Sequence, residues 1–116
     1  MISQQTAEKM ADYVSSAYES LSLKKYRSTL EDQQYLKLHE LVTILDGKRY
    51  AQVRWDALEE YEKEMWDQRK ELGLLDSGSI HDDEGNYWNV FQGEWEAIQA
   101  FVRFAEDKAT IIVQEM

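Results

Sequence analysis

The sequence predicts an α+β domain: three N-terminal helices, followed by a small antiparallel sheet of ββαβ order that includes a fourth helix. Three observations lead to this fold class. Apolar residues recur at three- and four-residue spacing through most of residues 4–72, which is typical of amphipathic helices. After Gly73 the pattern changes to short extended segments separated by turn residues. The 116 residues contain no proline, so every helix must end at a glycine or a capping residue.

The first two helices are predicted at residues 4–21 and about 29–45. The second begins at a capping box, because Ser28 is followed three residues later by Glu31, and Asp46-Gly47 ends it. The first carries one apolar stripe with helical spacing, made of Ala7, Met10, Ala11, Val14, Ala17, Tyr18 and Leu21.

A third helix is predicted from about Trp55 to Leu72. Asp56 and Glu59 form a second capping pair at its start, and Gly73 fits the position after its last turn. The preceding residues 48–54 fit either a short extended link or an early helical turn.

The last part of the chain is predicted to form the sheet. Short strands at residues 79–81 and 87–91 flank an acidic turn over residues 82–86. A helix over residues 94–107 follows. The β-branched run 109–113 is predicted to be a strand that pairs with this hairpin.

Length and composition limit the remaining possibilities. A chain with 43% hydrophobic and 12% aromatic residues predicts a single domain over residues 1–116 with its own core. The absence of cysteine excludes disulfides and thiolate metal sites. The sequence shows no signal peptide, no lipidation motif and no apolar run of membrane-spanning length, so we expect a cytoplasmic protein without membrane contact.

Negative charge is concentrated in the second half of the chain. Residues 1–54 carry eight Lys or Arg and seven Asp or Glu, a net charge of +1, whereas residues 55–116 carry five and sixteen, a net charge of −11. Such a field favours basic proteins and repels nucleic-acid phosphates, so we expect no direct contact with nucleic acid. The few basic residues near positions 24–27 and 48–54 are expected to pair internally.

No pattern for catalysis or cofactor binding stands out. His81 lies beside Asp82, Asp83 and Glu84, but adjacent residues rarely converge on one metal ion. An EF-hand alignment from Asp82 fails at the required glycine and glutamate. The carboxylates of the predicted third helix fit a solvated face better than acid–base pairs. We therefore expect no enzyme activity, no metal and no cofactor.

Aromatic residues crowd into residues 87–95. Strand alternation places Tyr87 and Phe91 on one face and Trp88 on the other, and a small sheet packed on one side does not easily bury both. We therefore expect Trp88, and Trp66 on the third helix, to be exposed as anchors of a protein interface. The alternative is that all of these aromatics belong to the core or its edge.

Together these features predict a small acidic protein inhibitor that binds and neutralises a basic nucleic-acid-handling protein or complex. It would be of the phage anti-defence or anti-CRISPR type, occluding or mimicking DNA, and its basic partner would be a nuclease, a CRISPR complex or a toxin. A phage-encoded protein would act in the host cytoplasm. Two alternatives stay open: an immunity protein or antitoxin against a toxin, and a structural or adaptor subunit that oligomerises. The chain itself is expected to be a monomer or a dimer. The predicted partner-binding residues are Asp56, Glu59, Glu60, Glu64, Trp66, Asp67, Asp82, Asp83, Glu84 and Trp88.

Overall fold

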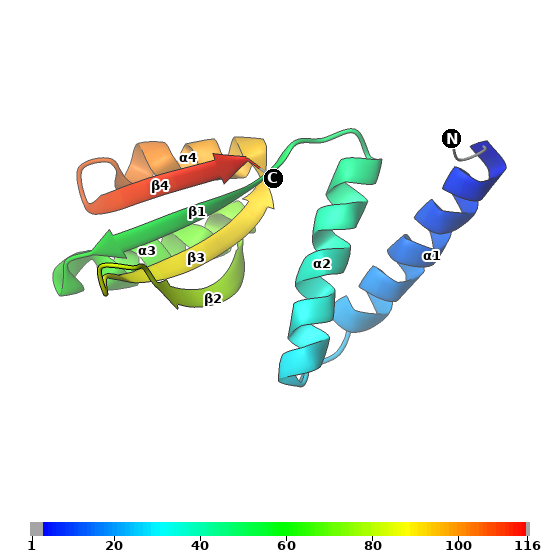
Figure 1. The fold of residues 1–116 in the computed structure, drawn as a ribbon, viewed down its shortest axis with the longest axis horizontal. Helices are drawn as coiled ribbons and strands as arrows, with labels where there is room; N and C mark the ends of the chain where they lie inside the picture. Colours follow the sequence, from blue (N-terminus) through cyan, green and yellow to red (C-terminus); the bar gives the residue numbers. More distant parts are fainter. Residues whose placement is uncertain (1–3, 116) are drawn as a thin grey trace. The chain divides into compact units, whose positions relative to one another are not determined.

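The computed structural model describes residues 4–115, with side chains at residue 9 and residues 11–115. It divides into two compact units, the first ending at Lys48 and the second beginning at Arg49. Over the described residues the chain forms four helices and four strands, which confirms the α+β class (Figure 1). Whether the two units fold together as the one cooperative domain that length predicts stays a prediction.

The first unit is a pair of helices, α1 (Gln4–Ser22) and α2 (Thr29–Leu45), close to the bounds that the sequence predicts. The predicted capping box is present: the Ser28 hydroxyl accepts from the Glu31 backbone N–H, and the Glu31 carboxylate accepts from the Ser28 backbone N–H. Between the helices, the rings of Tyr18 and Tyr35 stack with centroids 5.1 Å apart, and their hydroxyls lie 3.3 Å apart.

The second unit begins with a strand, so the predicted order of elements is wrong. Strand β1 (Tyr50–Ala57) includes Trp55 and Asp56, for which the sequence predicts the start of a helix. The physical reason is a period of two: Ala51, Val53 and Trp55 are all buried on one face of the strand. Helix α3 (Glu59–Leu72) starts only after Leu58 and has no side-chain cap.

Strand β1 is central to a four-stranded antiparallel sheet with the order β2-β3-β1-β4. Strands β2 (Leu75–His81) and β3 (Tyr87–Glu94) form the predicted hairpin. Helix α4 (Trp95–Ala105) follows, and β4 (Ala109–Glu115) pairs with β1 instead of with the hairpin. This βαββαβ arrangement is the split βαβ, or ferredoxin-like, topology.

The two edge strands of the sheet differ in regularity. In β2 the pairing with β3 shifts register between Asp76 and Ser79, and Gly78 adopts a positive φ of 91°. In β4 the pairing with β1 runs without a shift from Ala109 to Glu115. One edge is therefore bulged and the other is straight.

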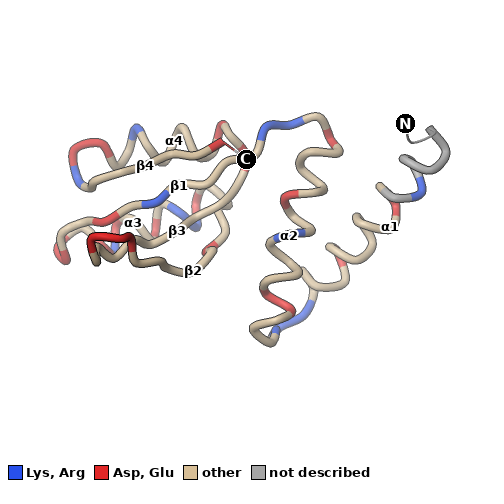
Figure 2. The backbone as a smooth tube through the Cα atoms, in the orientation of Figure 1, with Lys and Arg blue, Asp and Glu red and all other residues tan. Residues whose placement is uncertain are grey.

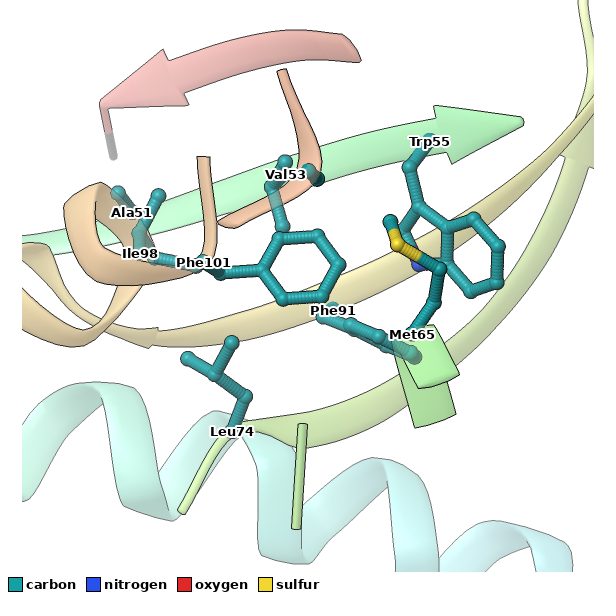
Figure 3. Packing of buried hydrophobic residues seen from close by; sticks show 9 residues of the cluster. Ala51, Val53, Trp55, Met65, Leu74, Phe91, Ile98 and Phe101 are labelled. Atoms are coloured by element: carbon teal, nitrogen blue, oxygen red, sulfur yellow. The ribbon is translucent and has the colours of Figure 1, made fainter. Parts of the chain in front are cut away.

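Helices α3 and α4 supply the apolar layer that covers one face of the sheet. Trp55 lies at the centre of this core, with its ring centroid 5.4 Å from that of Phe91 and 6.3 Å from that of Phe101. Figure 3 shows these side chains converging from the strands and the helices. The buried cluster consists of Ala51, Val53, Trp55, Met65, Leu74, Phe91, Ile98, Phe101 and Ala105, all from the second unit.

Among the helices of the described residues, none combines the length and the apolar character needed to cross a bilayer.

Candidate functional site

Four strand ends lie in one row across the sheet. His81 at the end of β2 pairs with Tyr87 at the start of β3, and Ala57 at the end of β1 pairs with Ala109 at the start of β4. Trp55 of β1 pairs with Asn89 of β3, so Ala57, two residues further along β1, lies opposite Tyr87. The His81–Tyr87 and Ala57–Ala109 pairs therefore lie in line across the sheet. Neighbouring strands are about 4.8 Å apart, so the row is about 14 Å wide.

Three connections leave the sheet from this row, and all of them are acidic. They are the link from β1 into the first turn of α3, the β2–β3 turn and the α4–β4 turn. Figure 2 shows their carboxylate-bearing segments gathered at this end of the sheet. We call this surface the acidic end; its residues are Asp56, Glu59, Glu60, Asp82, Asp83, Glu84, Glu106 and Asp107.

Little positive charge offsets the acidic end. Lys108 lies in the α4–β4 turn, where its ammonium is 3.0 Å from the Asp107 carboxylate and donates to the Phe104 carbonyl oxygen at 3.2 Å. The hydrogen bond that Lys108 donates to the Asp107 carboxylate lowers the pKa of Asp107. Among the described side chains, no Lys or Arg forms an ion pair with the other seven carboxylates of the acidic end.

The β2–β3 turn is built around the carboxylate of Asp82. Its Oδ1 accepts from the backbone N–H groups of Glu84 and Asn86 at 3.0 and 2.8 Å. Its Oδ2 accepts from the Asn86 amide at 3.0 Å and from the Trp88 indole N–H at 3.1 Å. These donors, the indole first, lower the pKa of Asp82 to about 2, so the carboxylate stays ionised. Asp82 therefore orders the turn, which leaves Asp83 and Glu84 exposed beside it.

The first turn of α3 presents Glu59 and Glu60 to solvent. Negative side chains are favourable there, because the N-terminus of a helix carries partial positive charge. Two carboxylates at this position therefore stabilise the helix start and add to the acidic end at the same time.

For the two tryptophans the structure supports the alternative, that they belong to the core or its edge, and not their exposure as anchors. Trp88 is only 8% exposed, and its indole N–H is occupied by Asp82. Trp66 is half-buried against the core, where its ring meets that of Phe91 edge-on with centroids 4.9 Å apart. Trp88 is therefore buried, and Trp66 is only partly exposed at the edge of the core. The exposed aromatic near the turn is Tyr87, at 47%.

Six of the predicted carboxylates gather at the acidic end: Asp56, Glu59, Glu60, Asp82, Asp83 and Glu84. Glu64 and Asp67 are exposed farther along α3, about 7.5 and 12 Å beyond Glu59 at 1.5 Å per residue.

Glu106 and Asp107 were missed. The sequence pattern predicts a helix over residues 94–107 that includes them, whereas α4 ends at Ala105 and they belong to the turn. Lys108, which follows them and bonds to Phe104, marks that helix end, but its partner is visible only in the structure.

The acidic end is not arranged as a metal centre. Over the described part of the chain, no three His, Cys, Asp or Glu side chains gather closely enough to hold an ion. The surface presents separated, solvated charges, which suit the recognition of an extended basic surface.

No protein-family model matches the chain, and no curated protein matches its sequence.

Proposed function

We propose that this chain is a small acidic inhibitor that binds and neutralises a basic nucleic-acid-handling protein in the cytoplasm, with the acidic end as its docking surface. The observation that supports this is the convergence of eight carboxylates from three separate connections on one end of the sheet, where Lys108 is the one cation among the described side chains that forms an ion pair with them. Proteins that bind nucleic acid present Lys and Arg at the positions that contact phosphates. A surface of fixed carboxylates competes for those same side chains.

The charge distribution also favours a basic protein over other partners. Residues 49–116 carry seven Lys or Arg and sixteen Asp or Glu, a net charge of −9. This charge speeds the encounter with a positive surface and opposes binding to nucleic acid itself. An immunity protein or antitoxin that covers the basic cleft of a toxin would use the same surface, so the identity of the captured partner separates these two forms of inhibition.

The test is capture of a partner followed by a matched charge reversal. The immobilised chain is exposed to heparin-retained proteins of its native host, the bound protein is identified, and its affinity is measured as salt is raised. The variant Glu60→Lys is compared with Glu96→Lys. Both residues are exposed and each is the second residue of its helix, α3 or α4, but Glu96 lies at the opposite end of the sheet.

We expect Glu60→Lys to weaken binding by roughly tenfold or more, and Glu96→Lys to weaken it far less, because only Glu60 belongs to the docking surface. Equal losses from the two variants would show that only net charge matters. An affinity that does not fall with salt would contradict electrostatic docking altogether.

A further inference from the structure

The α1–α2 hairpin leaves much of its apolar surface in contact with water. Tyr13 is 75% exposed, and Leu30, Leu41 and Leu45 are each more than a third exposed. Among the described side chains of this unit, only Thr43 is buried. A hairpin of two helices buries only the side of each helix that faces the other, so it gains most of its stability from further packing.

The exposed stripe borders a groove between the two helices. The groove has a volume of about 490 Å³. Its walls include Tyr13, Ala17 and Ser20 of α1 and Gln34, Lys37 and Leu38 of α2.

The residues along this groove repeat with the spacing of a helix bundle. On α1, Tyr13, Ala17 and Ser20 are separated by four and then three residues. On α2, Gln34 and Leu38 begin a four-three-four series that continues through two exposed residues, Leu41 and Leu45. Side chains at this spacing lie in one row on a helix and interdigitate with the same row on a neighbouring helix at a shallow crossing angle.

The charge of the hairpin fits a second copy of itself. Residues 1–48 carry six Lys or Arg and seven Asp or Glu, a net charge of −1, against −9 for residues 49–116. Two second units therefore repel each other, whereas two hairpins do not. The near-neutral hairpin offers no electrostatic attraction to a strongly basic or strongly acidic partner. It is instead complementary to another near-neutral helical surface with bundle spacing, and a second copy of the hairpin is such a surface.

We propose that two copies of the chain associate through this groove face, so that α1 and α2 of each copy form a four-helix bundle about a two-fold axis. Helices of 17 and 19 residues span about 25–28 Å at 1.5 Å per residue. Two of them side by side offer a face about 20 Å wide and therefore about 500–560 Å² in area, which is smaller than the roughly 800 Å² per partner of a standard interface and fits a dimer that dissociates on dilution. The inference is independent of the acidic end and stands whether or not that surface binds a basic protein.

The first measurement is the mass of the full chain in solution by sedimentation velocity and light scattering, from micromolar to millimolar concentration. We expect a species of twice the 13.7 kDa of one chain that dissociates on dilution. A single-chain mass at every concentration would overturn the proposal.

The second measurement locates the interface with matched leucine substitutions. Leu41→Glu places a carboxylate in the proposed seam, whereas Leu23→Glu makes the same change at a residue that is 79% exposed and lies outside both helices. We expect Leu41→Glu to raise the dissociation constant of the dimer at least about tenfold, since each copy would bury a charge, and Leu23→Glu to leave it unchanged. A dimer that survives Leu41→Glu would overturn this assignment of the surface.

Hydrogen exchange of the unaltered chain provides a readout that does not depend on whether a variant folds. Backbone amides of α1 and α2 should gain protection as concentration rises, while those of the sheet should not. Protection that rises in β4 and not in the hairpin would show that the copies meet elsewhere and would contradict the proposal.

Discussion

At the scale of single residues, Asp82 shows how one side chain can serve both fold and surface. Four N–H donors converge on its carboxylate: two from the backbone of the turn, one from the Asn86 amide and one from the Trp88 indole. The same interactions hold Trp88 in the sheet and hold Asp83 and Glu84 outward. A residue that the sequence suggests is simply part of an acidic run is therefore the structural centre of its turn.

Replacement of Asp82 by Ala should destabilise the β2–β3 hairpin and free the Trp88 indole. Because the folded pKa of Asp82 is about 2, below its ordinary value of 3.8, the ionised carboxylate stabilises the fold above pH 3.8. That contribution is lost as the pH falls from 3.8 toward 2. Thermal unfolding followed by tryptophan fluorescence should show a lower Tm for Asp82→Ala at neutral pH and a smaller gap from the unaltered chain near pH 2. A gap that stays constant across this range would contradict the role of the charge.

Phe91 offers a test of the core at the same scale. Its ring contacts those of Trp55, Trp66 and Phe101, and it has no exposed surface. Phe91→Ala should cost about 3–5 kcal/mol of unfolding free energy, because a large cavity is left among rigid rings. Urea unfolding followed by circular dichroism measures this cost. The control Tyr87→Ala, four residues earlier on the same strand face but half exposed, should cost less than about 1 kcal/mol.

At the scale of elements, helix α3 ends at a single glycine, Gly73, whose backbone conformation terminates the helix. Gly73 adopts a left-handed conformation with φ of 71°, and an added Cβ would meet no atom within 4 Å. Gly73→Ala should therefore cost only the backbone strain, about 1–2 kcal/mol. Gly73→Asn should cost less, because asparagine tolerates this conformation. Equal costs in chemical denaturation would mean that side-chain crowding, and not backbone conformation, is responsible.

Elements were predictable from the sequence where local chemistry decides them. The capping box at Ser28 and the glycine after α3 are such cases, as is the β2–β3 hairpin. Strand β1 was not recognised, because Asp56 and Glu59 imitate a capping pair and the alternation of Ala51, Val53 and Trp55 is short. Its identity as a strand depends on β3 and β4, which pair with it from far along the chain.

The candidate site was predictable only in part for the same reason. A run of acidic residues can be read from the sequence, but the meeting of three connections depends on strand register. The burial of Trp88 depends on packing that alternation alone does not decide, since it shows that Trp88 and Phe91 lie on opposite faces but not how far each is covered.

At the scale of the whole molecule, the buried cluster lies entirely within the second unit. We therefore expect residues 49–116 to fold when produced alone, with the dispersed amide resonances of a packed sheet and a single cooperative thermal transition. A fragment of residues 1–48 should be mostly unfolded when dilute, because it buries little by itself. Loss of dispersion in the 49–116 fragment would show instead that the sheet needs the helical hairpin.

The unequal edges of the sheet have a consequence for how the protein behaves when concentrated. The shifted register of β2 disrupts strand addition on its side, whereas β4 presents a regular row of backbone N–H and C=O groups with Ile112 and Val113 exposed. The net charge of the second unit then acts as a colloidal barrier that keeps one β4 edge from joining another. High salt lowers that barrier, as does acidification to the isoelectric point of about 4.6, where the net charge vanishes, and turbidity should rise under both conditions. The negative charge that would attract a basic partner thus also prevents the unpaired edge of β4 from pairing with β4 of another copy.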